Sequence, residues 1–201
     1  MDELYRVVQT VGQGHWQLQV NPRGKVQGAT KVTKPVKLPK TASAAAKQYW
    51  LMKSEPSECS IDDLVAAPSQ TVPWVGVRNY QARNFMRDSM QIGDGVLFYH
   101  SSCPLPGVAG LAEVASHAYP DATQFDKSSP YYDVKASKDA PRWLHVDVRL
   151  RNKTTVLSLA QMRADKSLET MVVLKAGNRL SVTPVTPAQW QAVLQLLFVS
   201  E

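Results

Sequence analysis

The sequence predicts an α+β domain built on a small β-barrel, and three observations support this prediction. Short strand-like segments, about five in number, alternate with short helical ones after residue 48. Of the 201 residues, 44% are hydrophobic and 20% are charged, a globular balance that argues against wholesale disorder, collagen and coiled coil. A core of ~150 residues buries about 68–70% of its unfolded surface, so it requires no disulfide bonds.

Membrane-spanning and secreted classes do not fit this sequence. No apolar run approaches the ~20 residues that cross a bilayer, and the N-terminus lacks an apolar segment followed by a small-residue cleavage site. The two cysteines, Cys59 and Cys103, fit a reducing compartment better than a disulfide framework. We expect a protein that is cytoplasmic if bacterial and nuclear if eukaryotic, and we favour a monomer.

The net charge of +6 lies in residues 1–48. This stretch carries eight Lys and Arg and two acidic residues, whereas the 15 basic and 15 acidic residues of the remainder cancel. A basic stretch beside a neutral body indicates attraction to a polyanion, most often a nucleic acid, although a solubilising tail has the same composition. We expect residues 1–48 to be a basic flexible tail and residues 49–201 to be the folded domain.

The two halves of this tail differ in composition. Residues 24–48 are rich in Lys, Thr, Ala and Pro and lack aromatic residues, which predicts a flexible linker. Residues 4–20 are weakly apolar and predict either a short hairpin that turns at Gly12 and Gly14 or a disordered segment.

Apolar and alternating runs predict strands at 49–53, 96–100, 108–114, 143–151 and 179–182. The 143–151 run alternates strictly, so two sets of residues are expected to face opposite ways: Leu144, Val146, Val148 and Leu150 on one face, and His145, Asp147, Arg149 and Arg151 on the other. Residues 119–142 form a long polar loop with four aromatic residues, and a loop of this length in a small domain is usually functional or mobile.

Helical spacing and capping residues predict two helices within the body of the domain. Ser60 is followed three residues later by Asp63, so a short helix begins after Ser60. Residues 79–89 follow helical spacing, with apolar residues on one face and Arg83 and Arg87 on a solvated face.

The C-terminal helix has the clearest signal in the sequence. Thr186 is a suitable N-cap, Pro187 occupies the first helical position, and Gln189 completes a capping box. The apolar stripe of this helix comprises Trp190, Val193, Leu194, Leu197 and Phe198.

The sequence contains none of the common enzyme or metal signatures. There is no glycine-rich phosphate loop, no CxxC pair and no HExxH motif. His100 and Cys103 supply two metal ligands where a structural zinc site requires four. A nucleophilic role for this pair is also disfavoured, because no helix start lies near the thiol to stabilise a thiolate. We expect no catalytic residue, no metal and no cofactor.

Six stretches carry a family resemblance, namely WLMKSEP (50–56), SIDDL (60–64), WVGVRNYQARNFMR (74–87), GDGVLFYHSS (93–102), PRWLHVDV (141–148) and RLSVTPVTPAQW (179–190). Together they resemble the EVE domain family over roughly residues 48–198, and EVE domains are similar to PUA and YTH domains. The resemblance implies a PUA-like, small and mostly antiparallel β-barrel flanked by short helices. It also implies a nucleic-acid-binding module with a pocket for a modified base, above all a modified cytosine in DNA.

The resemblance groups the candidate site residues around Trp74. This residue lies at a loop-to-helix junction beside Gly76, and its large flat face suits an extruded base. As a pocket wall, its side chain is expected to border solvent. Tyr131 and Tyr132 in the long loop are candidates for the opposite wall. A polar set at strand ends and at a helix start completes the predicted site: Lys53, Ser54, Arg78, Asn79, Tyr99, His100 and Ser101.

Different members of this polar set suit different parts of a nucleotide. Lys53 and Arg78 suit a phosphate group, whereas Asn and Ser side chains suit the edge of a base. Three other tryptophans are assigned to the core by alternation or by helical spacing: Trp50, Trp143 and Trp190.

The leading interpretation is a non-catalytic module that reads a modified base in an aromatic pocket, with the basic tail adding nonspecific affinity. Two alternatives stay open: an RNA-binding PUA-like module acting on tRNA or rRNA, and an enzyme or pocket protein for a free nucleoside-like heterocycle. An aromatic pocket with a few polar groups is common to all three. Dependence on a 2′-hydroxyl would favour RNA, and retained specificity for the free nucleoside would favour the third interpretation.

Overall fold

The structure, a computed structural model, describes residues 16–17, 30–31 and 46–198. The chain divides into two units, Met1–Ala45 and Ala46–Glu201, which are described separately.

The N-terminal unit contains one short pair of strands. β1 (Trp16–Gln17) pairs antiparallel with β2 (Thr30–Lys31). β2 falls within residues 24–48, the stretch that the sequence predicts as a flexible linker. The predicted hairpin turn at Gly12 and Gly14 lies outside the described residues.

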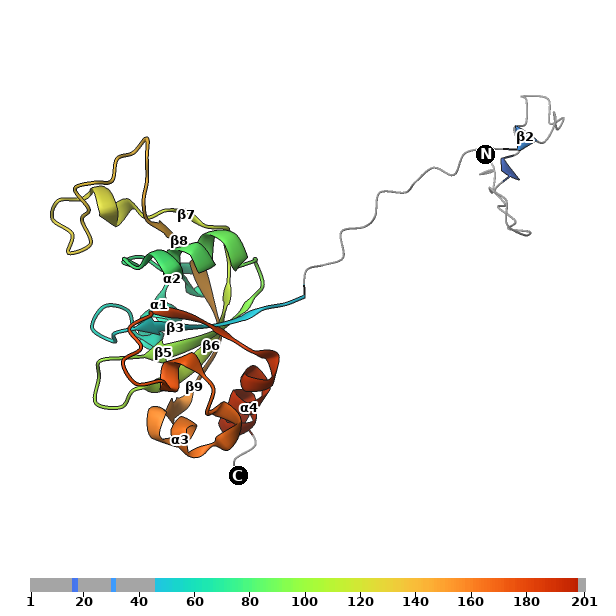
Figure 1. Cartoon of the computed structure of the whole chain (residues 1–201), viewed down its shortest axis with the longest axis vertical. Helices are drawn as coiled ribbons and strands as arrows, with labels where there is room; N and C mark the ends of the chain where they lie inside the picture. Colours follow the sequence, from blue (N-terminus) through green and yellow to red (C-terminus); the bar gives the residue numbers. More distant parts are fainter. Residues whose placement is uncertain (1–15, 18–29, 32–45, 199–201) are drawn as a thin grey trace. The chain divides into compact units, whose positions relative to one another are not determined.

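The second unit is built on a six-stranded sheet with the order β10-β3-β5-β6-β9-β4. Its strands are β3 (Tyr49–Ser54), β4 (Thr71–Pro73), β5 (Gly95–His100), β6 (Gly107–Val114), β9 (Asp147–Ser158) and β10 (Val182–Val185). Neighbouring strands are antiparallel except β3 and β5, which run parallel. Register shifts along β5, β6 and β9 bend these strands, so the sheet curls into a half-barrel (Figure 1). The predicted α+β class is confirmed, with the parallel pair as an exception to its antiparallel character.

Short helices pack on both sides of the sheet: α1 (Ile61–Ala66), α2 (Tyr80–Asn84), α3 (Leu159–Ala164) and α4 (Pro187–Phe198). A π-helical segment, Phe85–Ser89, continues α2. Short 3-10 turns lie at Pro68–Gln70, Ala122–Phe125, Lys166–Leu168 and Val172–Leu174. In Figure 1, α2 lies above the sheet, and α3 and α4 lie below it.

Side-chain caps explain where three of the helices begin. Ser60 Oγ accepts a hydrogen bond from Asp63 N at 3.1 Å, and the Asp63 carboxylate accepts one from Ser60 N at 2.7 Å. The predicted capping box of α4 is confirmed, because Gln189 N donates to Thr186 Oγ1 at 3.2 Å and Thr186 N donates to Gln189 Oε1 at 3.0 Å. A third capping box, formed by Ser158 and Gln161, starts α3, and this helix is not among those predicted.

The two faces of the sheet bury two hydrophobic cores. Along β3, Trp50 and Met52 point into one core and Leu51 points into the other, because successive side chains of a strand alternate. Phe98 and Tyr99 of β5 divide between the cores in the same way. The first core also takes side chains from α1 and α2, and the second takes them from α3 and α4.

The predicted strand at 143–151 divides into two elements. β8 (Leu144–His145) pairs with β7 (Tyr119–Pro120), whereas β9 is a separate and longer strand. Because the chain changes partner at Val146, the alternation of faces breaks there, and Val146 and His145 are both buried. The prediction of one uninterrupted alternating strand over 143–151 is therefore wrong.

Two predictions near the C-terminus need correction. The last strand covers 182–185 rather than 179–182. Phe198, assigned to the apolar stripe of α4, is 52% exposed at the end of that helix. The three tryptophans assigned to the core are buried as predicted. Within the described part of the chain, no helix has the length and apolar character needed to cross a membrane.

Candidate functional site

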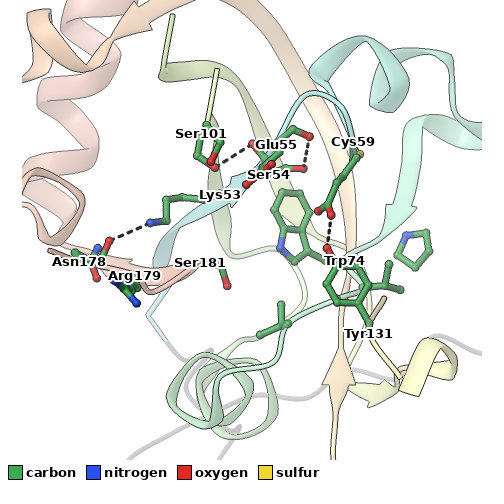
Figure 2. A pocket seen from close by; sticks show the side chains of 16 residues that line it. Lys53, Ser54, Glu55, Cys59, Trp74, Ser101, Tyr131, Asn178, Arg179 and Ser181 are labelled. Atoms are coloured by element: carbon green, nitrogen blue, oxygen red, sulfur yellow. Dashed lines mark hydrogen bonds between the residues drawn. The ribbon is translucent and has the colours of Figure 1, made fainter. Parts of the chain in front are cut away.

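A cavity of about 570 Å³ lies beside the carboxyl end of β3 (Figure 2). Because β3 and β5 run parallel, the residues that follow both strands meet at one edge of the sheet. The segment after β4, the segment before β10 and the long 119–142 loop complete the walls. The lining residues fall at 53–55, 58–59, 73–77, 101–102, 131, 178–179 and 181.

Trp74 lines this cavity and belongs to the first core at the same time. Its side chain is only 6% exposed, and its indole meets the Phe98 ring edge-on, with ring centroids 5.3 Å apart and an interplanar angle of 84°. Its backbone N–H donates to the Val146 carbonyl at 2.9 Å, which fixes the chain after β4. Trp74 is expected to border solvent as a pocket wall. It lines the cavity, but most of its side-chain surface is packed against the protein.

Tyr131 reaches the cavity from the long loop and rests on Gly76. A Cβ atom on Gly76 would lie 2.7 Å from Tyr131 Cζ, so a side chain there would displace the ring. Gly76 also has a positive φ of 82°, which other residues rarely adopt. The Tyr131 hydroxyl donates to Glu58 Oε1. Burial and this hydrogen bond raise the pKa of Tyr131 to about 12, so the hydroxyl remains a donor at neutral pH.

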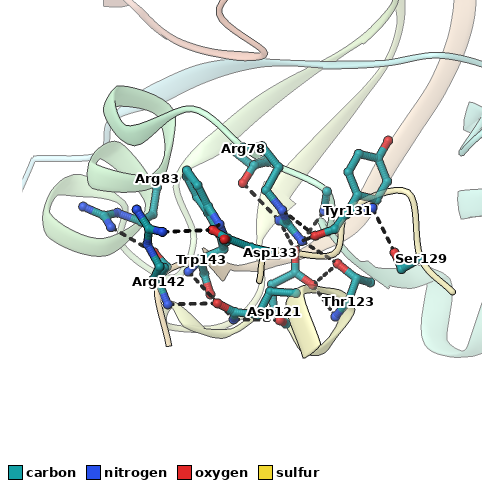
Figure 3. A network of polar contacts seen from close by, with 12 residues as sticks. Arg78, Arg83, Asp121, Thr123, Ser129, Tyr131, Asp133, Arg142 and Trp143 are labelled. Carbon is teal, nitrogen blue, oxygen red and sulfur yellow. Dashed lines mark hydrogen bonds and ion pairs between the residues drawn. The ribbon is translucent and has the colours of Figure 1, made fainter. Parts of the chain in front are cut away.

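An ion pair beneath the loop holds Tyr131 in this place (Figure 3). Arg78 Nε donates to the Tyr131 carbonyl at 2.8 Å, and Arg78 Nη1 donates to Asp121 Oδ2, also at 2.8 Å. The Asp121 side chain, 1% exposed, also accepts from Gly76 N at 3.0 Å and from Thr123 Oγ1 at 2.6 Å. Burial alone would raise the pKa of Asp121, but these hydrogen bonds hold it below its ordinary value. Arg78 thus directs its hydrogen bonds to the loop and does not line the cavity, and its predicted contact with a phosphate stays a prediction.

The remainder of the loop is ordered by a second set of polar contacts. Gln124 is fully buried, and its amide accepts from the backbone N–H of Arg142 and Trp143 while donating to the carbonyls of Asp121 and Trp143. Arg83 donates to the Arg142 carbonyl at 2.8 Å, so the prediction that Arg83 lies on a solvated face is wrong. Figure 3 shows Arg83 and Arg142 together at one end of this network and Tyr131 at the other.

Five of the ten predicted binding residues line the cavity: Lys53, Ser54, Trp74, Ser101 and Tyr131. Asn79 instead caps α2, where its Oδ1 accepts from the backbone of Gln81 at 2.8 Å and of Ala82 at 3.1 Å. Tyr132 is 38% exposed outside the cavity.

Two predicted residues on β5 also lie elsewhere. Tyr99 is 3% exposed in the second core, because it alternates with Phe98 and so faces away from Trp74. His100 Nε2 accepts from Ile61 N at 3.0 Å at the start of α1, and burial lowers its pKa, which keeps the ring neutral and able to accept.

Charged residues of both signs line the cavity on different walls. Lys53 and Arg179 lie on one side together with Asn178, whereas Trp74 and Tyr131 lie on the other (Figure 2). Lys53 N donates to the Ser181 carbonyl at 2.7 Å, an extension of the β10–β3 pairing that brings Arg179 beside Lys53. The predicted set omits Asn178 and Arg179, although Arg179 begins the RLSVTPVTPAQW stretch, which is the signal that could have included it.

Two acidic residues on the loop between β3 and α1, Glu55 and Glu58, also line the cavity and are not in the predicted set. Glu55 lies within the WLMKSEP stretch, and Glu58 follows two residues after its end. This stretch is the sequence signal that could have included both residues. The neighbouring thiol of Cys59 has a raised pKa, through burial and the charge of Asp63, so it is held in the thiol form. Within residues 46–198, no group of three or more His, Cys, Asp or Glu side chains is arranged to hold a metal.

A curled half-barrel flanked by short helices, with a cavity lined by aromatic and charged residues at the edge of its sheet, defines a small α+β domain. The EVE domain family matches residues 48–196, and the chain therefore belongs to that family. The resemblance that the sequence motifs carry is thereby confirmed.

Relatives of the chain span most of the same region. Thymocyte nuclear protein 1 of Homo sapiens is 43% identical over 166 residues, which cover 74% of this chain and 73% of that protein. A crystal structure of a protein from Pseudomonas syringae is 47% identical with a TM-score of 0.70, covering 74% of this chain and 98% of the other. The crystal structure of the human THYN1 protein in complex with 5-methylcytosine-containing DNA is 42% identical with a TM-score of 0.70, covering 75% of this chain and 97% of the other.

Proposed function

We propose that this chain is a non-catalytic nucleic-acid-binding module that receives a modified base, with modified cytosine in DNA as the leading candidate. One observation carries the proposal: Trp74 and Tyr131, from segments far apart in the sequence, line one cavity. The 42% identical human THYN1 protein, solved with 5-methylcytosine-containing DNA, supports the same class of ligand.

The cavity suits a base that has left its stack. Its volume of about 570 Å³ falls within the ~300–1,000 Å³ of ordinary small-ligand pockets. Stacking on an aromatic side chain contributes about 1–3 kcal/mol for each base. Lys53 and Arg179, on the wall away from Trp74, supply positive charge for the phosphate that accompanies the base. The phosphate role predicted for Arg78 thus passes to Arg179.

The chemistry of the lining favours binding over catalysis. A nucleophilic thiol acts as a thiolate, and the environment of Cys59 opposes ionisation. His100 does not line the cavity, and its Nε2 is occupied by the backbone N–H of Ile61. Cys59 and His100 therefore do not form an activated nucleophile–base pair in this cavity.

A binding titration tests this proposal. Fluorescence anisotropy of the full chain should be recorded at one fixed salt concentration against DNA and RNA oligonucleotides of identical sequence that carry cytosine or 5-methylcytosine. We expect tighter binding to the methylated DNA. Equal affinity for the unmodified oligonucleotide would exclude a modified-base reader, and tighter binding to the RNA would assign the site to RNA. Equally tight binding of the free nucleoside would favour a small-molecule pocket.

A further inference from the structure

Basic and acidic side chains line different walls of the cavity, and this separation of charge can orient a bound nucleotide. Lys53 and Arg179 form a cationic wall at the end of β3 and before β10, and Glu55 and Glu58 form an acidic wall on the loop between β3 and α1. Within residues 46–198, none of these four side chains forms an ion pair. Their charges are thus available to a ligand.

The acidic wall is held in place next to the aromatic one. Glu58 Oε1 accepts from the Tyr131 hydroxyl, and Tyr131 is itself fixed by Arg78 through its backbone carbonyl. No donor among residues 46–198 reaches Glu58 Oε2 or the carboxylate of Glu55. An ionised carboxylate only accepts hydrogen bonds. On this side of the cavity, Glu58 Oε2 and the Glu55 carboxylate are therefore acceptors that no side chain among residues 46–198 occupies.

The cationic wall offers the opposite character. Lys53 Nζ makes one long contact, 3.5 Å to the Asn178 carbonyl, and its ammonium carries three donors. Arg179 is exposed, and its guanidinium has no partner within the described residues. Phosphate oxygens are the natural complement of such a pair in a nucleic acid.

We propose that this polarity orients the bound nucleotide and selects its base. The phosphate lies at Lys53 and Arg179, and the base stacks at Trp74 with its hydrogen-bond donors directed at Glu58 and Glu55. Cytosine presents an amino group at N4, which a carboxylate accepts, whereas thymine and uracil present a carbonyl oxygen there, which a carboxylate repels. The site is therefore specific for bases with an exocyclic amino group. This inference deepens the proposed function and rests on it for the location of the base.

One matched pair of ligands isolates the amino group. Single-stranded DNA oligonucleotides that differ at one position, 5-methylcytosine or thymine, share the 5-methyl group and differ at N4 or O4 and at N3. We expect the full chain to favour 5-methylcytosine by about 5- to 100-fold, the range that one well-placed base contact supplies. Glu58→Gln preserves the side-chain volume and the acceptor for Tyr131 but adds a donor. This variant should reduce the preference to within about threefold of unity, because the new donor suits the thymine carbonyl.

Glu169→Gln is the matched control, because Glu169 is exposed, lies outside the cavity and changes net charge equally. It should leave the preference unchanged. A wild-type protein that binds both oligonucleotides equally, or a Glu58→Gln variant combined with Glu55→Gln that keeps the full preference, would overturn the inference. The proposed function fails by a different result, namely equal binding of cytosine and 5-methylcytosine, which leaves the amino-group selection intact.

The opposite wall is tested by salt dependence. Lys53→Gln and Arg179→Gln should each weaken the binding of both oligonucleotides by the same factor. Each variant should also reduce the magnitude of the slope of log K against log salt concentration by about 0.7, the value for one phosphate on a single strand. Lys166→Gln, an exposed control outside the cavity, should change neither the base preference nor the slope. A change in base preference on removal of Lys53 or Arg179, with an unchanged slope, would reverse the assigned orientation.

Discussion

Replacement of Trp74 by alanine is expected to damage stability and binding together. Burial of all but 6% of the side chain, and its edge-on contact with Phe98, place this residue among core tryptophans, whose loss costs about 3–5 kcal/mol of unfolding free energy. Loss of the stacking face should weaken modified-base binding by a further ~1–3 kcal/mol. The first figure is a large share of a typical stability of ~5–15 kcal/mol. The sequence alone leaves two outcomes open, a small stability cost for a pocket wall and about 3–5 kcal/mol for a core residue, and the burial of Trp74 favours the second.

Phenylalanine at the same position separates the two effects. Trp74→Phe keeps an aromatic face of smaller area, so its stability cost should be less than the ~3–5 kcal/mol of alanine. Trp190→Phe is the matched control, because Trp190 is 8% exposed in the second core, where it stacks on Tyr49 with centroids 4.5 Å apart. Denaturant unfolding gives the two stabilities, and anisotropy titrations under conditions where both variants are folded give the affinities.

Both variants should lose stability, and only Trp74→Phe should lose part of the preference for the modified base. A folded Trp74→Phe or Trp74→Ala protein that retains the full preference would refute the stacking role, and Tyr131 would then be the remaining aromatic candidate. Equal loss of preference in the Trp190 variant would also refute it, because stability alone would then explain the effect.

Three further changes have expected outcomes. Removal of residues 1–45 should flatten the salt dependence of nucleic-acid binding and leave the melting temperature unchanged; a large fall in melting temperature would show that this segment stabilises the domain. Asp121→Asn should cost about 3–5 kcal/mol in denaturant unfolding and weaken base binding, because the Arg78 guanidinium loses its buried counter-charge; unchanged binding would count against the loop as a wall. Burial lowers the pKa of His145, so stability should fall as pH decreases from about 6.5 through the lowered folded-state value. His145→Phe should remove part of that dependence in melts between pH 7 and 5, and an unchanged profile would exclude this source.

Local signals account for the parts of the fold that the sequence predicts well. The capping boxes at Ser60 and at Thr186 depend on residues three apart, so the sequence alone places the starts of α1 and α4 correctly. The burial of Trp50 follows from alternation within one strand, and that of Trp190 from the spacing of one helix. These predictions hold because each depends only on residues within one helix or strand.

Long-range pairing accounts for what the sequence does not predict. Arg179 joins the site only through the β10–β3 ladder, and residues 52 and 182, which pair there, are more than a hundred positions apart in the chain. Arg78 is a reasonable phosphate ligand by residue type, yet the fold places Asp121 beneath it. The position of Tyr99 is also not predictable. β5 is buried and apolar on both faces, so its sequence does not indicate which face lies toward the site.

The two aromatic residues of the cavity differ in how they can change, and this difference bears on specificity. Trp74 rests on Phe98, which is fully buried, so any movement of the indole requires repacking of the first core. Tyr131 rests on Gly76, is held through its backbone carbonyl by hydrogen bonds from Arg78, and belongs to neither hydrophobic core. A substitution that alters which base is accepted, while leaving the domain stable, is therefore expected on the Tyr131 side of the cavity, and substitutions on the Trp74 side should change stability first.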